Sequence, residues 1–322
     1  MKYRIGSFNM KNFGAYPSRD FKKIAEIIHG EKMDIVAFQE VLSEGKGVQR
    51  LLEENVRRRF SSWGFCWASP KDTTDISKLN EIIANDRRGE GYAYIWNTLK
   101  FKLAESGRLD SDKQFEPRII NSLSKDVKNV DCRMFARAPY YIRLQPCHGG
   151  FNELRLLNIH IYFGKNTIPE IEKRKIEFDT LVQEIYPRIN RERYGNFRSA
   201  YTIAMGDYNL NIVRPGLSIS PEISQASLNE VYRCTGGRNP YSVITIQEQL
   251  TTLRNNSSPT SQGILSNYAN NYDHFTYSPE TSPFKGVSCY AVDAVSKYCC
   301  GDFEYYRKNI SDHVPIIMEI DL

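Results

Sequence analysis

The sequence predicts an α/β protein in which two β-sheets pack face to face and helices cover their outer sides. Strands recur along the whole 322-residue chain, and a few long amphipathic helices are inserted between them. The first forty residues already alternate strand, helix and strand, which is typical of α/β proteins. Because no linker divides the chain, we expect residues 1–322 to form a single domain.

The elements of the first half follow from apolar runs and their spacing. Helices are predicted where apolar residues recur every three or four positions, as Phe21, Ile24 and Ile28 do. The predicted strands are Tyr3–Phe8, Asp34–Val41, Gly91–Trp96, Phe101–Ser106, Ala136–Leu144 and Leu154–Ile161, and the predicted helices are Asp20–Ile28 and Val48–Arg58. We expect Gly91–Trp96 and Phe101–Ser106 to pair through a turn at 97–100.

The second half begins with an amphipathic helix, Glu170–Ile185, and then returns to strands. The predicted strands are Tyr201–Gly206, His274–Tyr277, Ser288–Val292 and Val314–Ile320. Polar stretches rich in Ser, Asn, Gly or Pro predict loops. These loops cover 69–86, 111–131 and 254–266.

Composition limits the partners and the compartment. The net charge of +5 and the pI near 8.7 are compatible with a polyanion, and basic clusters at 57–59, 173–175 and 188–193 favour a phosphate backbone, although each could also be a solvated helix face. Seven cysteines without a CxxC pair fit neither a zinc site nor a dense disulfide framework. With no signal peptide and no long apolar run, we expect a cytoplasmic protein without a transmembrane segment.

Polar and charged residues stand where apolar strands end. Asn9, Glu40, His160 and Asp207 each follow such a run, and similar positions are held by Asn209, Asp273, Asp312 and His313. Each residue alone is most simply a turn, cap or structural residue. Together they supply oxygen ligands, imidazoles and amides that could converge on one rim.

That set of groups suits phosphodiester hydrolysis. A divalent cation held by carboxylates neutralises charge on the phosphate, and two imidazoles can serve as base and acid. Each imidazole needs a carboxylate to fix its orientation. The candidate carboxylates are Glu40, Glu90, Asp207, Asp273 and Asp312.

Short segments of the chain resemble the blocks of the endonuclease/exonuclease/phosphatase superfamily, in the same order. They are FNMKNFG (8–14), FQEV (38–41), GDYN (206–209), YDHF (272–275) and SDH (311–313), so the resemblance runs from residue 5 to residue 318. GEGYAYIW (89–96), FARAP (135–139) and NIH (158–160) are most similar to the deoxyribonuclease I branch.

The resemblance implies a four-layer α/β/β/α fold and a divalent-metal-dependent phosphodiesterase. Its expected substrate is nucleic acid, and the activity it implies is a DNA endonuclease that nicks and leaves 5′-phosphate and 3′-hydroxyl ends. The implied cofactor is Mg²⁺ or Mn²⁺, with Ca²⁺ as a possible helper.

The resemblance also implies a role for each matched residue. Glu40 would be the main metal ligand, helped by Asn9 and Asp312, while Asp207 and Asn209 would hold the scissile phosphate or a second metal and orient the water. His313 would pair with Asp273 and His160 with Glu90, and which pair is the base stays open. The expected nucleic-acid contacts are Arg137, Lys11, Asn209 and Arg88. Arg88 stands where deoxyribonuclease I has a Tyr against the minor groove, so the same DNA-binding mode is not implied.

Two other classes of function remain open at this point. Sphingomyelinases and inositol phosphatases share this set of groups, and a sphingomyelinase would need an exposed aromatic hairpin for lipid. The only candidate for that hairpin is the stretch 62–67, for which a buried strand is the favoured interpretation. A catalytically inactive binding scaffold would show a lost ligand, whereas every matched position carries a competent residue.

Overall fold

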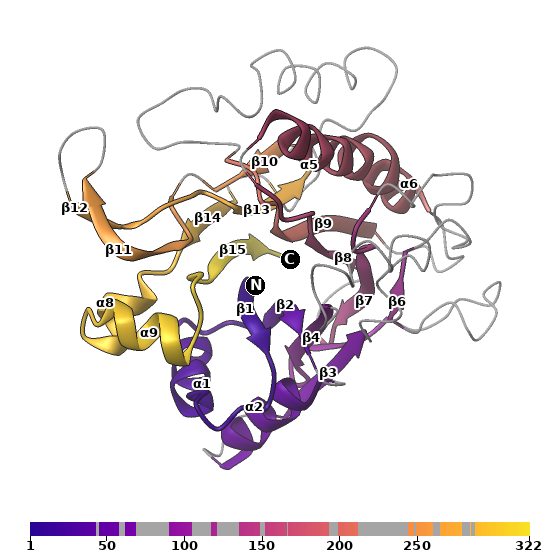
Figure 1. Ribbon diagram of the computed structural model, residues 1–322. Helices are drawn as coiled ribbons and strands as arrows, with labels where there is room; N and C mark the ends of the chain where they lie inside the picture. The colour runs from indigo at the N-terminus through magenta and orange to yellow at the C-terminus, as the bar shows by residue number, and fades with distance from the viewer. Residues whose placement is uncertain are drawn as a thin grey trace.

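The structure of the chain is a computed structural model (Figure 1). The structure describes residues 1–42, 45–57, 62–68, 90–104, 117–120, 135–148, 152–165, 167–192, 199–211, 244–247, 249–259, 265–278, 284 and 287–322. The predicted loop 69–86 lies outside the described residues, as does Arg88. Most of the predicted loop 111–131 also lies outside them, and the part that is described contains the short strand β6 (Arg118–Ile119).

Two large mixed sheets form the centre of the described structure. The first has six strands in the order β14 (Ser288–Ala291), β15 (Ile316–Asp321), β1 (Lys2–Phe13), β2 (Ile35–Val41), β4 (Gly91–Asn97) and β3 (Trp63–Ala68). The second has the order β10 (Ile244–Ile246), β13 (Asp273–Tyr277), β9 (Ser199–Asp207), β8 (Asn152–His160), β7 (Tyr140–Pro146) and β5 (Phe101–Leu103), and β6 also pairs with β7. The β1–β2 and β8–β9 pairs are parallel.

Alternating residues of each strand pack into different layers. In β2, Ile35 and Ala37 enter the apolar core between the two sheets, while Val36 and Phe38 enter the core on the outer side. On that outer side lie α1 (Phe21–Gly30), α2 (Lys46–Arg57), α8 (Ala294–Cys299) and α9 (Phe303–Asn309). The other sheet is covered by α5 (Ile168–Thr180), a π-helical turn η5 (Leu181–Ile185) and α6 (Tyr186–Arg191). The four-layer α/β/β/α prediction is confirmed.

Three predictions about strands were wrong in detail. β4 and β5 do not pair, because the turn at 97–100 carries the chain from one sheet to the other. The predicted loop 254–266 contains most of the residues of a two-stranded sheet, in which β11 (Leu253–Pro259) pairs with β12 (Leu265–Tyr268). Both strands are largely polar, so the sequence gives no apolar alternation that would predict them. The aromatic stretch 62–67 does contain a strand, β3, but β3 is the edge strand of its sheet and is mostly half-buried.

Two short helices near the end of the chain were not predicted. Asp293 caps α8 by accepting a hydrogen bond from Ser296 N, and Asp302 caps α9 by accepting one from Tyr305 N. Asp is a common N-cap residue, so the sequence did contain a signal for the start of each of these helices. Of the helices that the structure describes, none is long and apolar enough to cross a bilayer.

Candidate active site

The register of the second sheet places three functional groups in one row. His160 ends β8 directly beside Asp207 at the end of β9, and Asp207 faces Asp273 at the start of β13. The parallel pairing of β8 and β9 brings both of their carboxyl ends to the same edge. The predicted convergence of these residues therefore follows from sheet register.

Gly206 makes this close approach possible. Its φ is +147°, and a Cβ atom at this position would lie 1.9 Å from the carbonyl oxygen of Ile159 on the neighbouring strand. Only glycine tolerates both the backbone angle and the contact. The Gly of the GDYN segment thus lets Asp207 sit beside the end of β8.

The first sheet supplies the opposite side of the site through bulges in its two parallel strands. The β1–β2 register shifts between Asn9 and Phe13, and the β2–β4 register shifts between Phe38 and Val41. Glu40 lies within the second irregularity with φ +59°. A bulge reorients a side chain at a strand end, which here turns the Glu40 carboxylate towards β1.

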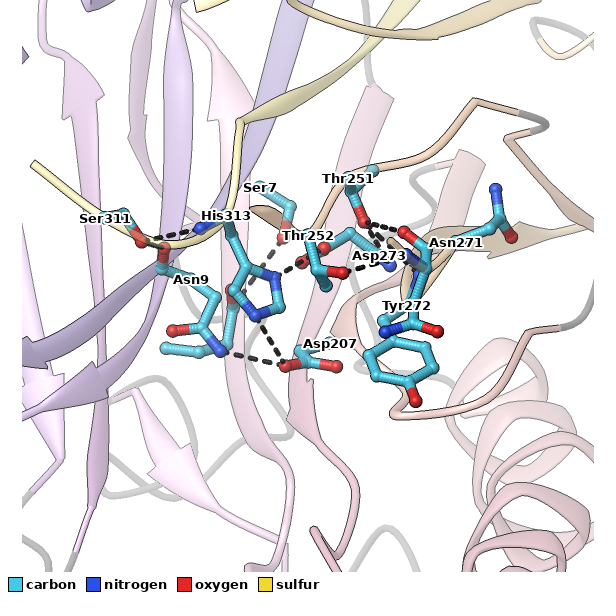
Figure 2. Close-up of polar contacts among 12 residues, drawn as sticks. Ser7, Asn9, Asp207, Thr251, Thr252, Asn271, Tyr272, Asp273, Ser311 and His313 are labelled. Atoms are coloured by element: carbon cyan, nitrogen blue, oxygen red, sulfur yellow. Dashed lines mark hydrogen bonds and ion pairs between the residues drawn. The ribbon is translucent and has the colours of Figure 1, made fainter. Parts of the chain in front are cut away.

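Asn9 connects the two sheets at this rim. Its Nδ2 donates to Asp207 Oδ2 at 2.9 Å and to Glu40 Oε1 at 3.1 Å, and Figure 2 shows the contact with Asp207. Glu40 Oε2 also accepts from the backbone N–H of Asn12 at 2.8 Å. The Asn9 amide therefore fixes the distance between the carboxylates of Glu40 and Asp207, which come from opposite sheets.

His313 is oriented by Asp273. Its Nδ1 lies 2.8 Å from Asp273 Oδ2, and its Nε2 points towards Asp207 Oδ2 at 3.7 Å (Figure 2). Burial by itself would lower the pKa of His313, but the charges of Asp273 and Asp207 outweigh burial and raise it to about 10. At neutral pH this imidazole therefore carries both protons and can donate from Nε2.

His160 forms a second pair of the same kind. Its Nδ1 lies 3.3 Å from Glu90 Oε2, and its Nε2 lies 3.6 Å from Asp207 Oδ2. Glu90 in turn forms an ion pair with Arg137, at 2.6 Å between Glu90 Oε2 and Arg137 Nη2. Both imidazoles thus present Nε2 to one oxygen of Asp207 and Nδ1 to a different carboxylate.

The site concentrates acidic groups in a buried place. Burial raises the pKa of Glu40, and the nearby Glu90 carboxylate raises it further. Burial is also the largest cause of the raised pKa of Asp207. Buried carboxylates that repel one another are stabilised in their charged form by a cation.

The donor atoms fit a divalent cation. Glu40, Glu90 and His160 each offer one ligand atom, and these atoms lie within 4.8 Å of one another. A second such group consists of Asp207, Asp273 and His313. Carboxylate oxygens are the ligands that Mg²⁺, Mn²⁺ and Ca²⁺ accept.

Not every predicted site residue contacts this centre directly. Asp312 forms an ion pair with Lys11, at 2.7 Å between Asp312 Oδ2 and Lys11 Nζ, and both side chains are partly exposed at the rim. Arg137 is nearly buried against Glu90, where the sequence predicted a phosphate contact. Asn209 donates from Nδ2 to the carbonyl of Ile161 at 2.9 Å, so its side-chain amide ties the end of β9 to β8.

Some residues that support the site were given no role from the sequence, although Ser311, Gln39 and Asn158 lie within its matched blocks. The Thr251 hydroxyl lies 3.3 Å from the backbone nitrogens of both Tyr272 and Asp273, and Ser311 accepts from His313 N while donating to Asn9 O (Figure 2). Between the sheets, Asn158 accepts from Gln39 Nε2 at 2.7 Å. Such polar pairs become visible only when the two sheets are packed together.

Comparison by sequence found no relative: no family model matches the chain, and no curated protein matches it. Comparison by structure found similar folds. The Danio rerio TDP2 complexed with single strand DNA product is 17% identical, with a TM-score of 0.56 over 100% of this chain and 99% of that one. Truncated Caenorhabditis elegans TDP2 is 14% identical, with a TM-score of 0.53 over 100% and 98%.

An endonuclease/exonuclease/phosphatase family protein from Bacteroides thetaiotaomicron is similar to the same degree. It is 15% identical, with a TM-score of 0.52 over 100% of this chain and 96% of that one. At such identities the likeness establishes the fold. The chain therefore shares the fold of these solved structures, which agrees with the four-layer fold that its sequence blocks imply.

Proposed function

We propose that this chain is a divalent-metal-dependent phosphodiesterase that hydrolyses nucleic acid, acting as a DNA endonuclease that leaves 5′-phosphate and 3′-hydroxyl ends. The observation that supports this most directly is the arrangement around Asp207. Two imidazoles face one of its oxygens, and each imidazole has its own carboxylate behind it. This arrangement provides two oriented proton-transfer groups on either side of Asp207.

Glu40 would hold the cation, with Asn9 and Asp312 as the further ligands that the family resemblance implies. When bound, the cation supplies charge neutralisation for the phosphate oxygens and for the developing charge on the leaving oxygen. Asn9 keeps Glu40 and Asp207 in register from the opposite sheet. Asp207 would orient the water and the scissile phosphate, and Asn209 would hold the end of β9 against β8.

The two imidazoles divide the proton transfers. His313 is protonated at neutral pH, because Asp273 and Asp207 raise its pKa to about 10, and it would donate its Nε2 proton to the leaving 3′-oxygen as the P–O3′ bond breaks and the water oxygen bonds to phosphorus. His160 then accepts the proton of the water through Nε2, while Glu90 holds its Nδ1. Arg137 keeps the Glu90 carboxylate in place through their ion pair.

Nucleic acid is the proposed substrate because its backbone offers phosphodiesters to a basic protein. The net charge is +5, and Lys11, Arg188 and Arg191 are at least partly exposed. A fold neighbour at 17% identity, the Danio rerio TDP2, was solved with a single strand DNA product. That likeness supports nucleic acid over lipid or inositol phosphate as the substrate class.

A plasmid-nicking assay tests the proposal. We expect Mg²⁺-dependent conversion of supercoiled DNA to the nicked form, abolished by EDTA, with 5′-phosphate ends that accept ligation. A parallel panel of single-stranded DNA, RNA, sphingomyelin and inositol phosphates identifies the substrate class. No cleavage of any nucleic acid by the folded protein, together with turnover of a lipid or inositol substrate, would replace the nuclease proposal by that activity.

Single histidine variants test the mechanism within the same assay. His160→Ala and His313→Ala should each lower kcat by roughly 10²–10⁴-fold, the usual contribution of a general acid or base. His148→Ala is the matched control, because His148 is exposed and lies away from the site. Near-normal turnover by either site variant would remove that imidazole from the mechanism.

A further inference from the structure

The basic cluster 173–175 on α5 does not form one solvated face. Lys173 and Lys175 lie on the surface, where each pairs with a Glu three residues earlier, at 2.9 and 3.0 Å. Arg174 between them points into the protein, and only 1% of it is exposed. A guanidinium is rarely buried unless its donors are used, so the contacts of Arg174 indicate what it does.

Arg174 donates to backbone carbonyls of two loops that leave the active-site rim. Its Nη1 donates to the carbonyl of Asn209 at 3.1 Å, and its Nη2 donates to the carbonyls of Gly164 and Lys165. Asn209 lies two residues after Asp207, and Gly164 lies four residues after His160. Through these hydrogen bonds, one planar guanidinium holds the backbone that follows Asp207 and the backbone that follows His160.

Glu177, one helical turn later, accepts hydrogen bonds from the backbone of two further segments. Its Oε1 accepts from Ala136 N at 2.8 Å, and its Oε2 accepts from Tyr162 N at 3.0 Å. Ala136 directly precedes Arg137, the partner of Glu90, and Tyr162 lies two residues after His160. Glu177 is buried as well, with 3% exposed.

We propose that Arg174 and Glu177 are positioning residues that set the spacing between His160, Asp207 and the Arg137–Glu90 pair from the outer side of the sheet. Neither residue touches the proposed reaction centre, so each would act through the backbone of the loops it holds. Arg174 serves its three carbonyls from two nitrogens of a planar fork, whereas the three N–H donors of a Lys ammonium all lie on one nitrogen at the end of a flexible chain. The catalytic part of this inference rests on the proposed nuclease function.

The variants Arg174→Lys and Glu177→Gln test the inference, because each keeps the size of the side chain and removes part of its hydrogen bonding. We expect each to lower kcat by roughly 10- to 100-fold, as is usual when a residue that orients an active-site group is changed. KM should stay within about twofold, because no substrate contact is lost. Ile168→Ala, at an exposed position of the same helix, should leave both constants unchanged.

A second measurement does not depend on catalysis. The imidazole ¹⁵N resonances of His160, assigned with His160→Ala and recorded at one pH without added cation, should shift in Arg174→Lys and Glu177→Gln. They should stay in place in Ile168→Ala. If the wild-type protein cleaves no phosphodiester, the proposed function fails, while these resonances still decide whether α5 positions His160.

Three results would overturn the inference. The first is wild-type kcat and unshifted resonances in both α5 variants. The second is a rise in KM at constant kcat, which would make Arg174 a phosphate contact instead. The third is a loss of activity that matches the unfolded fraction measured by thermal denaturation, which would make the role purely structural. If Arg174→Lys does not fold, Glu177→Gln decides on the same criteria.

Discussion

Asn9 on β1 donates its side-chain amide to Asp207 on β9, at 2.9 Å across the interface between the two sheets. The same nitrogen reaches Glu40 at 3.1 Å, so a single buried amide fixes the distance between the carboxylates of opposite sheets. In a sandwich active site, each sheet can position its own residues by register. Contacts of this kind, together with the apolar core between the sheets, set the position of one half relative to the other.

Asn9→Ala should therefore lower activity without unfolding the protein. We expect a loss of roughly 10- to 100-fold in kcat/KM for DNA, the usual range when a supporting hydrogen bond is removed. Steady-state nicking kinetics measure it, and Asn267→Ala on β12 is a control of the same residue type. Unchanged kinetics with an unchanged Tm would show that Asn9 does not organise the site.

Glu40→Gln should weaken the dependence on the cation. Removing the negative charge of Glu40 takes away a hard oxygen ligand, while the amide keeps the shape of the side chain. Isothermal titration with Mg²⁺ should show a Kd raised by at least about tenfold. Asp312→Asn should have a smaller effect, because Asp312 is paired with Lys11 at the rim. An equal or larger effect in Asp312→Asn would make Asp312 the principal ligand.

Glu153 should make the fold sensitive to acid. It lies buried between Arg143 and Arg155, with nitrogen–oxygen distances of 2.7 to 3.0 Å. Burial alone would raise the pKa of Glu153, but its bonds to the two arginines lower it overall. The stabilisation is thus fully present above the pKa of an unfolded Glu, about 4.3, and is lost as the pH falls through the lower folded value.

The variant Glu153→Gln measures that contribution. At pH 7 it should destabilise the fold by about 3–5 kcal/mol, because two buried guanidinium groups lose their counter-charge. Urea unfolding at several pH values should also show a flatter acid limb than in the wild type. A loss below about 1 kcal/mol at pH 7 would show that these charges are not buried as tightly as the structure places them.

His274 should make stability depend on pH in a higher window. Burial lowers its pKa to about 4, although Nε2 lies 2.9 Å from the carbonyl of Asn271 and 3.3 Å from that of Leu210. The unfolded chain takes up a proton near pH 6.5, whereas the folded protein does so only near pH 4. Stability should therefore fall as the pH drops from 6.5 to 4, by roughly 3 kcal/mol from this residue.

His274→Phe removes that component, because Phe does not titrate and can still pack against Tyr208. Chemical denaturation at pH 7 and pH 4.5 should show a smaller difference between the two pH values than in the wild type. His274→Phe also removes the hydrogen bonds of the imidazole, and this loss should lower the free energy of unfolding equally at both pH values. An identical pH difference in the two proteins would mean that His274 is protonated in the folded state.

The sequence by itself determined the fold and the chemical groups at the strand ends. Alternation and apolar runs located most of the strands, because the side chains of a strand alternate between two layers. The polar residues at the ends of those strands indicated that Asn9, Glu40, His160 and Asp207 belong to one site, because parallel strands place their carboxyl ends at the same edge of a sheet. Asp293 and Asp302 also signalled two helices that the sequence analysis did not predict.

Only the tertiary structure decided which groups meet. It assigned β4 and β5 to different sheets, paired Arg137 with Glu90, and paired Lys11 with Asp312. It also buried Arg174 between the exposed Lys173 and the partly exposed Lys175, a difference that cannot be read from three consecutive basic residues. The physical reason is that local sequence fixes where a side chain sits on its own strand or helix, whereas its partner comes from a distant segment whose position depends on how the layers pack.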